Sequence, residues 1–192
     1  MTTLGIVQAR TSSSRLPSKV LVPIGGKHMI LYQLERLRRC TRLDRLVLAT
    51  SDDSSDDFLA NIVSAAGFEV FRGDLKDVLE RFRACASNIQ PSTVVRLTGD
   101  CPLSDPELID ELVEAFEEGG WDYLANCADD QQLSVPDGFD AEVFQAELLE
   151  RKIEPPFKPV IEDKFGQQGF GQYFNTEEGN AIADTHIPDI KK

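Results

Sequence analysis

The chain has 192 residues, 41% of them hydrophobic and 28% charged, which is typical of a soluble globular domain with one continuous core. Its net charge of -13 disfavours a general role in nucleic-acid binding, because an acidic protein is repelled by a phosphate backbone. No apolar run approaches the roughly 18 residues of a membrane helix, so we expect a cytoplasmic protein without membrane contact.

Hydrophobic periodicity divides the first 125 residues into alternating strands and helices. We predict strands at residues 4–8, 46–50, 69–71, 93–97 and 121–125. Helices are predicted at 29–37, 58–65, 75–86 and 105–118. The second runs through Phe58, Ile62 and Ala65 and ends at Gly67. This alternation predicts an α/β fold with a mainly parallel sheet and helices on both faces, which binds ligands at the carboxyl ends of its strands.

The chain changes character after about residue 152. Pro155, Pro156 and Pro159 interrupt any helix, and the Gly/Gln/aromatic stretch at 166–174 has no clear period. We therefore predict a folded domain over residues 1–150. Residues 151–192 form a divergent C-terminal arm that is either packed on the sheet or partly disordered.

The cysteines give no sign of a metal or disulfide framework. They are isolated in the sequence, form no CxxC pair and have only two histidines to accompany them: Cys40, Cys85, Cys101 and Cys127. This pattern argues against a zinc site and favours reduced thiols.

Positive charge is concentrated in the first quarter of the chain. Residues 1–45 hold nine Lys or Arg and two acids, whereas the other 147 hold 11 and 31. This asymmetry suggests a local anion site. We interpret one basic set as a solvated helix face: Arg36, Arg38, Arg39, Arg42 and Arg45.

The loop after the first strand has the composition of a phosphate site. Residues 8–19, QARTSSSRLPSK, contain three cations, four serines and a threonine, and no acid. Arginine forks, a lysine point charge and exposed backbone N–H groups suit a triphosphate. Composition alone leaves a solvent-exposed polar loop as the alternative. The segment GGKH at 25–28 lacks the spacing of a Walker loop, and no GxGxxG is present.

A carboxylate follows the strand at 93–97. The order Gly99-Asp100 puts Asp100 at the carboxyl edge of the sheet, facing the cationic loop, where it could bind Mg²⁺ together with phosphates and waters. The alternative is a turn aspartate that accepts backbone N–H groups. Asp105, which precedes Pro106, is interpreted as a helix cap. The same interpretation applies to Asp52 and Asp53.

Several polar side chains bracket a loop near residues 127–136 and could bind sugar hydroxyls, although composition alone is a weak signal. They are Tyr123, Asn126, Asp137, Asp140 and Glu142. Gly138 among them should be a turn residue with positive φ.

Six segments in this order resemble the SpsF-like branch of the acylneuraminate/KDO cytidylyltransferase family, whose members serve spore-coat and surface-polysaccharide synthesis. The resemblance covers roughly residues 4–147. The segments are IVQARTSSSRLPSKVL, LVLATSDD, FRGDLKDVLERF, VVRLTGDCPLSDPELID, DYLANC and PDGFDAEVF.

The resemblance implies a Rossmann-like nucleotide-diphospho-sugar transferase fold for residues 1–150, with CTP as substrate and Mg²⁺ as cofactor. The implied nucleotide-binding residues are Gln8, Ala9, Arg10, Ser14, Arg15, Lys19, Arg72 and Asp77. Asp100 matches the family's metal ligand, and Arg10, Lys19 and Asp100 are the implied catalytic residues. The polar set from Tyr123 to Glu142 falls in the acceptor-sugar region. Relatives often have glycine where this chain has Ser18.

The C-terminal segment departs from the family pattern. An REHVT-type segment is absent, and residues 183–190 only faintly resemble a late motif whose aspartate is the second metal ligand; Asp184 occupies that place. A missing ligand would leave a catalytically impaired nucleotide-binding subunit as an alternative to an active enzyme. A glycosyltransferase that consumes a nucleotide-sugar is a second alternative, although no D-x-D motif is present at Asp100.

The expected reaction is transfer of CMP from CTP to an acidic, sialic- or KDO-like sugar, with release of pyrophosphate. The sequence does not specify the acceptor. Because relatives are commonly dimers, a homodimer is a further expectation of the resemblance.

Overall fold

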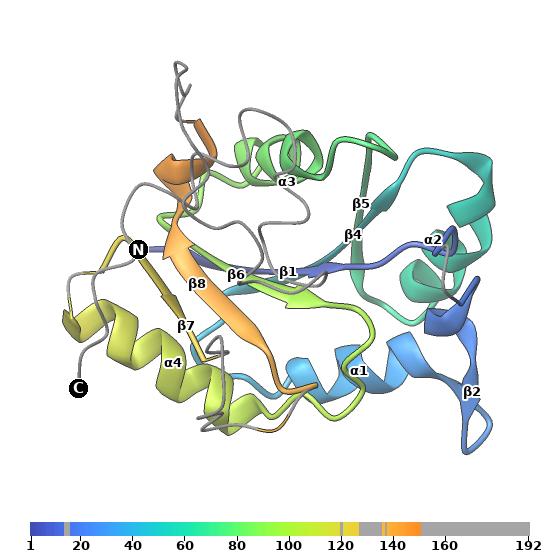
Figure 1. Cartoon of the computed structure of the whole chain (residues 1–192), viewed down its shortest axis with the longest axis horizontal. Helices are drawn as coiled ribbons and strands as arrows, with labels where there is room; N and C mark the ends of the chain where they lie inside the picture. The colour runs from blue at the N-terminus through green and yellow to red at the C-terminus, as the bar shows by residue number, and fades with distance from the viewer. Residues whose placement is uncertain (14–15, 120, 127–135, 137, 151–192) are drawn as a thin grey trace.

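The computed structural model describes residues 1–13, 16–119, 121–126, 136 and 138–150, which form a sandwich of helices around one six-stranded sheet (Figure 1). The strand order is β5-β4-β1-β6-β8-β7. The strands are β1 (Thr3–Gln8), β4 (Arg45–Ser51), β5 (Glu69–Gly73), β6 (Thr93–Thr98), β7 (Tyr123–Ala125) and β8 (Ala141–Gln145). β8 pairs antiparallel with both of its neighbours, β6 and β7, and the other pairs of this sheet are parallel.

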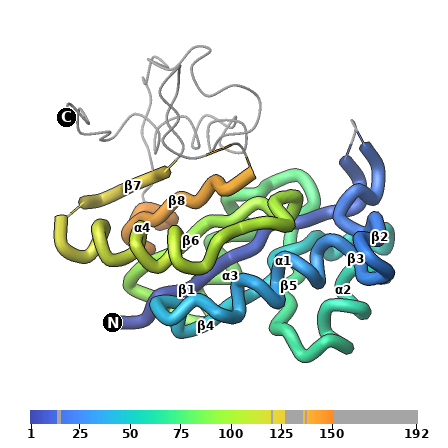
Figure 2. Tube along the Cα trace, turned by 90° about the horizontal axis from the view of Figure 1, so that it is seen from below, coloured from blue at the N-terminus to red at the C-terminus, as the bar shows by residue number. Residues whose placement is uncertain are grey.

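Helices cover both faces of this sheet, as Figures 1 and 2 show. Helices α1 (Met29–Leu37), α2 (Asp57–Ala65) and α4 (Pro106–Gly119) pack on one face. Helix α3 (Val78–Ser87) and the 3-10 turn η3 (Ala146–Glu150) pack on the other. The remaining elements are η1 (Lys19–Leu21), η2 (Ser54–Asp56) and a hairpin of β2 (Pro23–Ile24) and β3 (Lys27–His28). The predicted α/β class and mainly parallel sheet are confirmed.

The alternation of side chains along the central strands explains the two-sided core. Leu4 and Ile6 of β1 face α3, whereas Val7 faces the α1 side, and all three are fully buried. On α1, Ile30 and Leu34 recur at helical spacing and pack on Val7's side. Burial of about 25 cal/mol per Å² of apolar surface on both faces holds the helices to the sheet.

Two predicted helices differ in detail from the structure. Helix α3 begins at Val78, three residues later than expected, because the side chain of Asp77 caps it by accepting the N–H of Glu80 at 2.8 Å. Helix α2 begins at Asp57, one residue earlier than predicted, and Phe58 on it is 55% exposed while Leu59 and Val63 are buried. Gly67 follows α2 with φ of 79°, as predicted for a helix-ending glycine.

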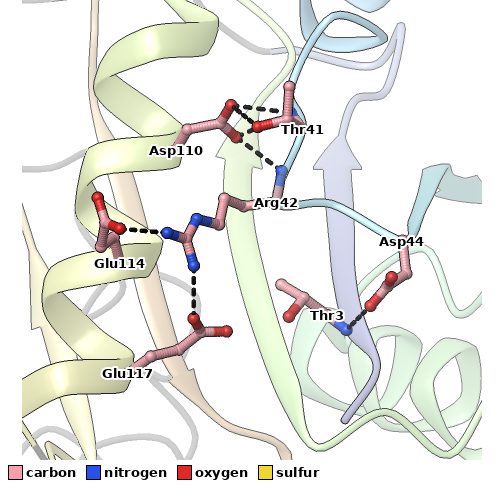
Figure 3. A network of polar contacts seen from close by, with 7 residues as sticks. All are labelled: Thr3, Thr41, Arg42, Asp44, Asp110, Glu114 and Glu117. Atoms are coloured by element: carbon pink, nitrogen blue, oxygen red, sulfur yellow. Dashed lines mark hydrogen bonds and ion pairs between the residues drawn. The ribbon is translucent and has the colours of Figure 1, made fainter.

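Polar contacts attach the segment between α1 and β4 to its surroundings (Figure 3). Asp110 of α4 accepts the backbone N–H groups of Thr41 and Arg42 and the hydroxyl of Thr41. The Arg42 guanidinium pairs with Glu114 and Glu117. These contacts join the α1–β4 connection to α4.

The interpretation of five arginines as a solvated helix face is therefore wrong for four of them, whereas Arg39 is exposed and agrees with it. Arg36 donates to the Ser104 carbonyl at 2.9 Å, Arg38 lies over the Phe68 ring, and Arg45 pairs with a β5 glutamate. Together with Arg42, they link α1 and the following segment to other elements, because arginine can both stack and donate several hydrogen bonds.

No helix in the described part of the chain has the length and apolar character needed to cross a bilayer. The described cysteines, Cys40, Cys85 and Cys101, are buried, and none forms a disulfide within the described residues. Burial raises the pKa of the Cys40 and Cys85 thiols to about 12, which keeps both protonated.

The order of connections determines where a ligand can bind. From β1 the chain runs outward to β4 and β5, and α3 then carries it back to β6 on the other side of β1. The strand order reverses between β1 and β6, and in open α/β sheets ligands bind at such a switch point, outside the carboxyl ends of the strands.

Candidate functional site

The carboxyl ends of β1 and β6 are held in close contact. Gln8 pairs with Thr98 at the end of the parallel ladder, and the Gly99 N–H donates to the Gln8 carbonyl at 2.8 Å. A Cβ at position 99 would lie 2.6 Å from the Cβ of Ala9 and 2.9 Å from the Gln8 oxygen. Position 99 therefore requires glycine, and the residue that follows is placed beside the loop after β1.

An ion pair joins that loop to Asp100. The Lys19 ammonium contacts the Asp100 carboxylate, and each side chain is about 30% exposed. The sequence predicted a cationic loop and a strand-end carboxylate that face each other, and the structure brings their side chains together. Ser14 and Arg15 of the same loop lie outside the described residues.

The loop is closed at its base by a backbone hydrogen bond. The Ser18 N–H donates to the Thr11 carbonyl at 2.8 Å, and Ser18 adopts left-handed backbone angles, φ 58° and ψ 22°. A residue with a Cβ is strained there, so this backbone conformation favours glycine.

Replacement of Ser18 should show this strain directly. Ser18→Gly removes the Cβ clash, worth about 1–2 kcal/mol, at an entropic cost of about 0.5–1 kcal/mol, so the free energy of unfolding should stay unchanged or rise slightly. Ser18→Val should lower the free energy of unfolding by at least about 1 kcal/mol, because β-branched residues avoid this conformation. Urea unfolding of the two variants measures both effects; equal stabilities would contradict the assignment.

A buried carboxylate binds the first residue of the loop. Asp56 is fully buried, and its Oδ1 accepts both the N–H and the hydroxyl of Thr11 at 2.7 Å. Its Oδ2 accepts the hydroxyl and the N–H of Ser51 at the end of β4. Burial alone would raise the pKa of Asp56, but the hydrogen bonds from Ser51 and Thr11 outweigh it and lower the pKa.

The stability that Asp56 contributes should disappear in acid. Because its folded pKa is lowered below the value of about 3.9 of an unfolded Asp, the contribution is complete above that pH and is lost as the pH falls through the folded pKa. Urea unfolding between about pH 6 and pH 3 should show that the free energy of unfolding falls more steeply for the wild type than for Asp56→Asn. Parallel curves would contradict this role.

Other residues of the predicted nucleotide set are engaged in contacts around the same edge. Arg10 reaches the carbonyl of Leu75, between β5 and α3, at 3.4 Å. Arg72 donates to the Ser51 and Asp53 carbonyls, both at 2.9 Å, and pairs with Asp57. Its guanidinium thus joins β5 to the segment after β4. Asp77, as described above, caps α3.

The loop that carries Asp100 is supported from α1. Gln33 is fully buried, and its amide donates to the Thr98 carbonyl at 2.7 Å and to the Ser104 hydroxyl at 3.1 Å. The Ser104 hydroxyl in turn donates to the Cys101 carbonyl at 2.7 Å. These bonds fix both ends of the turn in which Asp100 lies. Asp105 accepts the Glu107 N–H at 2.9 Å, in agreement with its predicted capping role.

A second polar group lies further along the sheet, on the α3 face. Glu142 of β8 is directly opposite Arg96 of β6, and the two form a buried ion pair. Tyr123 donates a hydrogen bond to the same carboxylate. Burial raises the pKa of Glu142, and the Arg96 guanidinium offsets part of this effect. Gln8 shares this face, and its buried side-chain oxygen has no hydrogen-bond partner in the described part of the chain.

The remaining residues of the predicted acceptor set lie near the base of the 127–135 segment. The Asn126 amide donates to the Phe139 carbonyl at 2.9 Å and accepts the Ala141 N–H at 2.8 Å, so both of its polar atoms bind the backbone. Asp140 is half-buried beside Glu142. Gly138 has φ of 93°, as predicted. Asp137 and Asp184 lie outside the described residues.

Three supporting residues were not predicted from the sequence: Gln33, Asp56 and Arg96. Asp56 was one of several acids in 52–57, and only its burial distinguishes it. A charged residue at the fourth position of an otherwise apolar strand was the available signal for Arg96. Nothing in the local sequence separates Gln33 from other polar positions of α1.

No group of three or more His, Cys, Asp or Glu side chains that could hold a metal ion occurs within the described residues. The Asp100 carboxylate does bind a cation, the Lys19 ammonium, and a hard oxygen at this edge suits Mg²⁺ when phosphates and waters complete the shell.

The chain is similar to several known proteins. A family model described as cytidylyltransferase matches residues 4–148. The spore coat polysaccharide biosynthesis protein SpsF of Bacillus subtilis is 41% identical over 150 residues, which cover 76% of this chain and 60% of that protein. The 3-deoxy-manno-octulosonate cytidylyltransferase of an Anaeromyxobacter species is 35% identical over 117 residues, 59% of this chain and 47% of that one. The chain thus spans about half to three fifths of these relatives.

Solved structures agree with this assignment. A cytidylyltransferase from Leptospira borgpetersenii superposes with a TM-score of 0.73 at 35% identity, over 78% of this chain and 63% of that one. A CMP:2-keto-3-deoxy-manno-octonic acid synthetase complexed with CTP shares the fold at 16% identity, with a TM-score of 0.62 over 78% of this chain and 76% of that one. The predicted nucleotide-diphospho-sugar transferase fold is confirmed. Because one family model spans residues 4–148, the chain belongs to the cytidylyltransferase family and is an SpsF-like member of it.

Proposed function

We propose that the protein transfers CMP from CTP to an acidic, sialic- or KDO-like sugar in surface-polysaccharide synthesis, with release of pyrophosphate. The observation that supports this most directly is the contact between Lys19 and Asp100 at the β1–β6 switch point. A cation for phosphates and a carboxylate for a metal lie side by side where the fold offers a ligand crevice.

Mg²⁺ is part of this proposal. Asp100 would hold the ion, with phosphate oxygens and waters as the other ligands, and Asp184 is proposed as a further ligand from the C-terminal segment. When bound, the ion would supply positive charge against the oxygens of the α-phosphate. The Lys19–Asp100 contact is compatible with this arrangement, because Asp100 already binds a cation that Mg²⁺ would replace when Lys19 moves to the phosphates.

The chain's own residues would act mainly by position and charge. A hydroxyl oxygen of the sugar forms a bond to the α-phosphorus, the bond from that phosphorus to the bridging oxygen breaks, and pyrophosphate leaves with the electron pair. The hydroxyl proton passes to solvent. Arg10, Arg15 and Lys19 would hold the pyrophosphate as negative charge develops on it. Gln8 and Ala9 would line the site at the end of β1.

The acceptor would lie over the sheet beyond β6. The proposed contacts are the polar residues that follow β7 and precede β8, with the Arg96–Glu142 pair beneath them. The buried Arg96–Glu142 pair would form a rigid, charged surface beneath the sugar, since the two side chains are fixed by each other and by the strands that carry them.

A pyrophosphate-release screen tests the function. The protein is incubated with Mg²⁺, CTP and a panel of acidic sugars, and with UTP, GTP or ATP in place of CTP. We expect pyrophosphate only with CTP and at least one acidic sugar. Nucleotide binding without release for any sugar would refute the catalytic proposal, and equal release with another nucleotide would refute the assignment of CTP.

A further inference from the structure

A carboxylate outside the predicted site controls the base of the cationic loop. Asp56 stands at the start of α2, yet its side chain points inward and is fully buried. It receives four hydrogen bonds, two from Thr11 and two from Ser51. A buried carboxylate destabilises a protein unless its oxygens accept hydrogen bonds in this way. The contacts of Asp56 with Thr11 and Ser51 are therefore specific.

These contacts lead to the proposed phosphate-binding lysine in three steps. Asp56 binds the N–H of Thr11, and the carbonyl of Thr11 accepts the N–H of Ser18 at 2.8 Å. The next residue is Lys19, whose ammonium contacts Asp100. The carboxylate therefore fixes the point at which the loop leaves the sheet and, through the Thr11–Ser18 bond, the point at which it returns.

We propose that Asp56 is a positioning residue of the nucleotide site: it anchors Thr11 to the end of β4 and so sets the geometry in which the loop offers its cations to the phosphates of CTP. The proposal rests on the function proposed above. Asp56 acts through Thr11 and need not touch the nucleotide.

Simple electrostatics predicts the opposite sign from this proposal. A negative charge near a phosphate site repels the nucleotide, so its removal alone would strengthen CTP binding. An anchor predicts that removal weakens binding, because the loop loses its preorganised geometry. The sign of the change in CTP affinity therefore separates positioning from a general effect of charge.

Asp56→Asn is the main test. Asparagine keeps one acceptor for Thr11 but presents an amide donor to the Ser51 N–H, so part of the network is lost while volume is preserved. Asp53→Asn is the matched control, because Asp53 lies in the same turn, carries the same charge and uses its side chain to accept the Ser55 N–H. Calorimetry should show CTP affinity about tenfold weaker for Asp56→Asn and within about twofold of wild type for Asp53→Asn.

Amide hydrogen exchange gives a readout that needs no nucleotide. The Thr11 and Ser18 amides should exchange faster in Asp56→Asn than in wild type, and remain protected in Asp53→Asn. Thr11→Val, which replaces the hydroxyl by a methyl group, should fold normally and weaken CTP binding less than Asp56→Asn does. Its effect should be less than additive with Asp56→Asn, because the two residues share one contact.

Two results would overturn the proposal. One is CTP affinity in Asp56→Asn that equals or exceeds wild type; the other is additive losses in the double variant. If the wild-type protein binds no CTP, the proposed function fails. Amide exchange tests the anchoring role separately: an exchange rate of the Thr11 amide that is the same in Asp56→Asn and wild type would refute that role by itself.

Discussion

Asp100→Asn should reduce pyrophosphate release about 10²–10³-fold while leaving the fold intact. The substitution preserves shape but removes the charge that would hold Mg²⁺ against the α-phosphate, and loss of one such preorganised electrostatic contact costs about 3–4 kcal/mol in the transition state. The Lys19–Asp100 pair is about 30% exposed, so its loss should change the free energy of unfolding little. Initial rates at saturating CTP and varied Mg²⁺ measure the effect.

Asp105→Asn provides the control for this result. Asp105 lies five residues on and changes charge in the same way, but it caps α4 by accepting the Glu107 N–H. Because asparagine caps helices as well as aspartate does, this variant should keep both its stability and its activity. If Asp100→Asn retained full activity, or if both variants lost it equally, Asp100 would not belong to the reacting centre.

The sequence was sufficient for most of the sheet and its helices. Runs of three to five residues predicted every strand of the six-stranded sheet except β8, and the residue order Gly99-Asp100 predicted a carboxylate at the edge of the sheet. Element boundaries were less accurate where a side chain ends or starts a helix. Helix α3 illustrates this, since Leu75 is apolar and fits the pattern, but the Asp77 cap delays the helix to Val78.

Contacts between distant segments could not be predicted in the same way. Asp56 lies 45 residues from Thr11, and its burial depends on how α2 approaches the end of β4. Arg72 was expected to bind the nucleotide because of the family resemblance. In the structure it donates to carbonyls of the segment after β4, a partnership that strand pairing creates. Hydrophobic periodicity carries no information about such polar pairs.

The predicted acceptor residues divide in the structure according to their place on β7 and β8. Tyr123 and Glu142 point to the α3 face and share a buried network with Arg96, whereas Asn126 binds backbone groups. An alternating strand pattern identifies which residues share a face, but it cannot tell a carboxylate that is buried in an ion pair from one that is available to a ligand. That distinction needs the neighbouring strand.

Lys19→Ala should have opposite effects on the two ligands of the site. A hydrogen bond from a charged donor contributes about 1.5–3 kcal/mol, so loss of the ammonium should weaken CTP binding about 10- to 100-fold. The same ammonium contacts Asp100 and therefore competes with a divalent cation for that carboxylate. Without nucleotide, Lys19→Ala should bind Mn²⁺ more tightly than wild type. Calorimetry with CTP and electron paramagnetic resonance with Mn²⁺ measure the two affinities.

Lys27→Ala is the matched control for Lys19→Ala. Lys27 lies in the hairpin next to the loop and pairs with Glu35, so its replacement removes the same charge from another ion pair. If only the net charge mattered, the two variants would show the same small changes in Mn²⁺ and CTP affinity, since long-range charge acts alike on them. A specific exchange at Asp100 predicts the opposed changes in Lys19→Ala alone. Unchanged CTP affinity in that variant would remove the loop from the nucleotide site. Weakened CTP binding with unchanged Mn²⁺ affinity would leave Lys19 as a phosphate ligand that does not compete for Asp100.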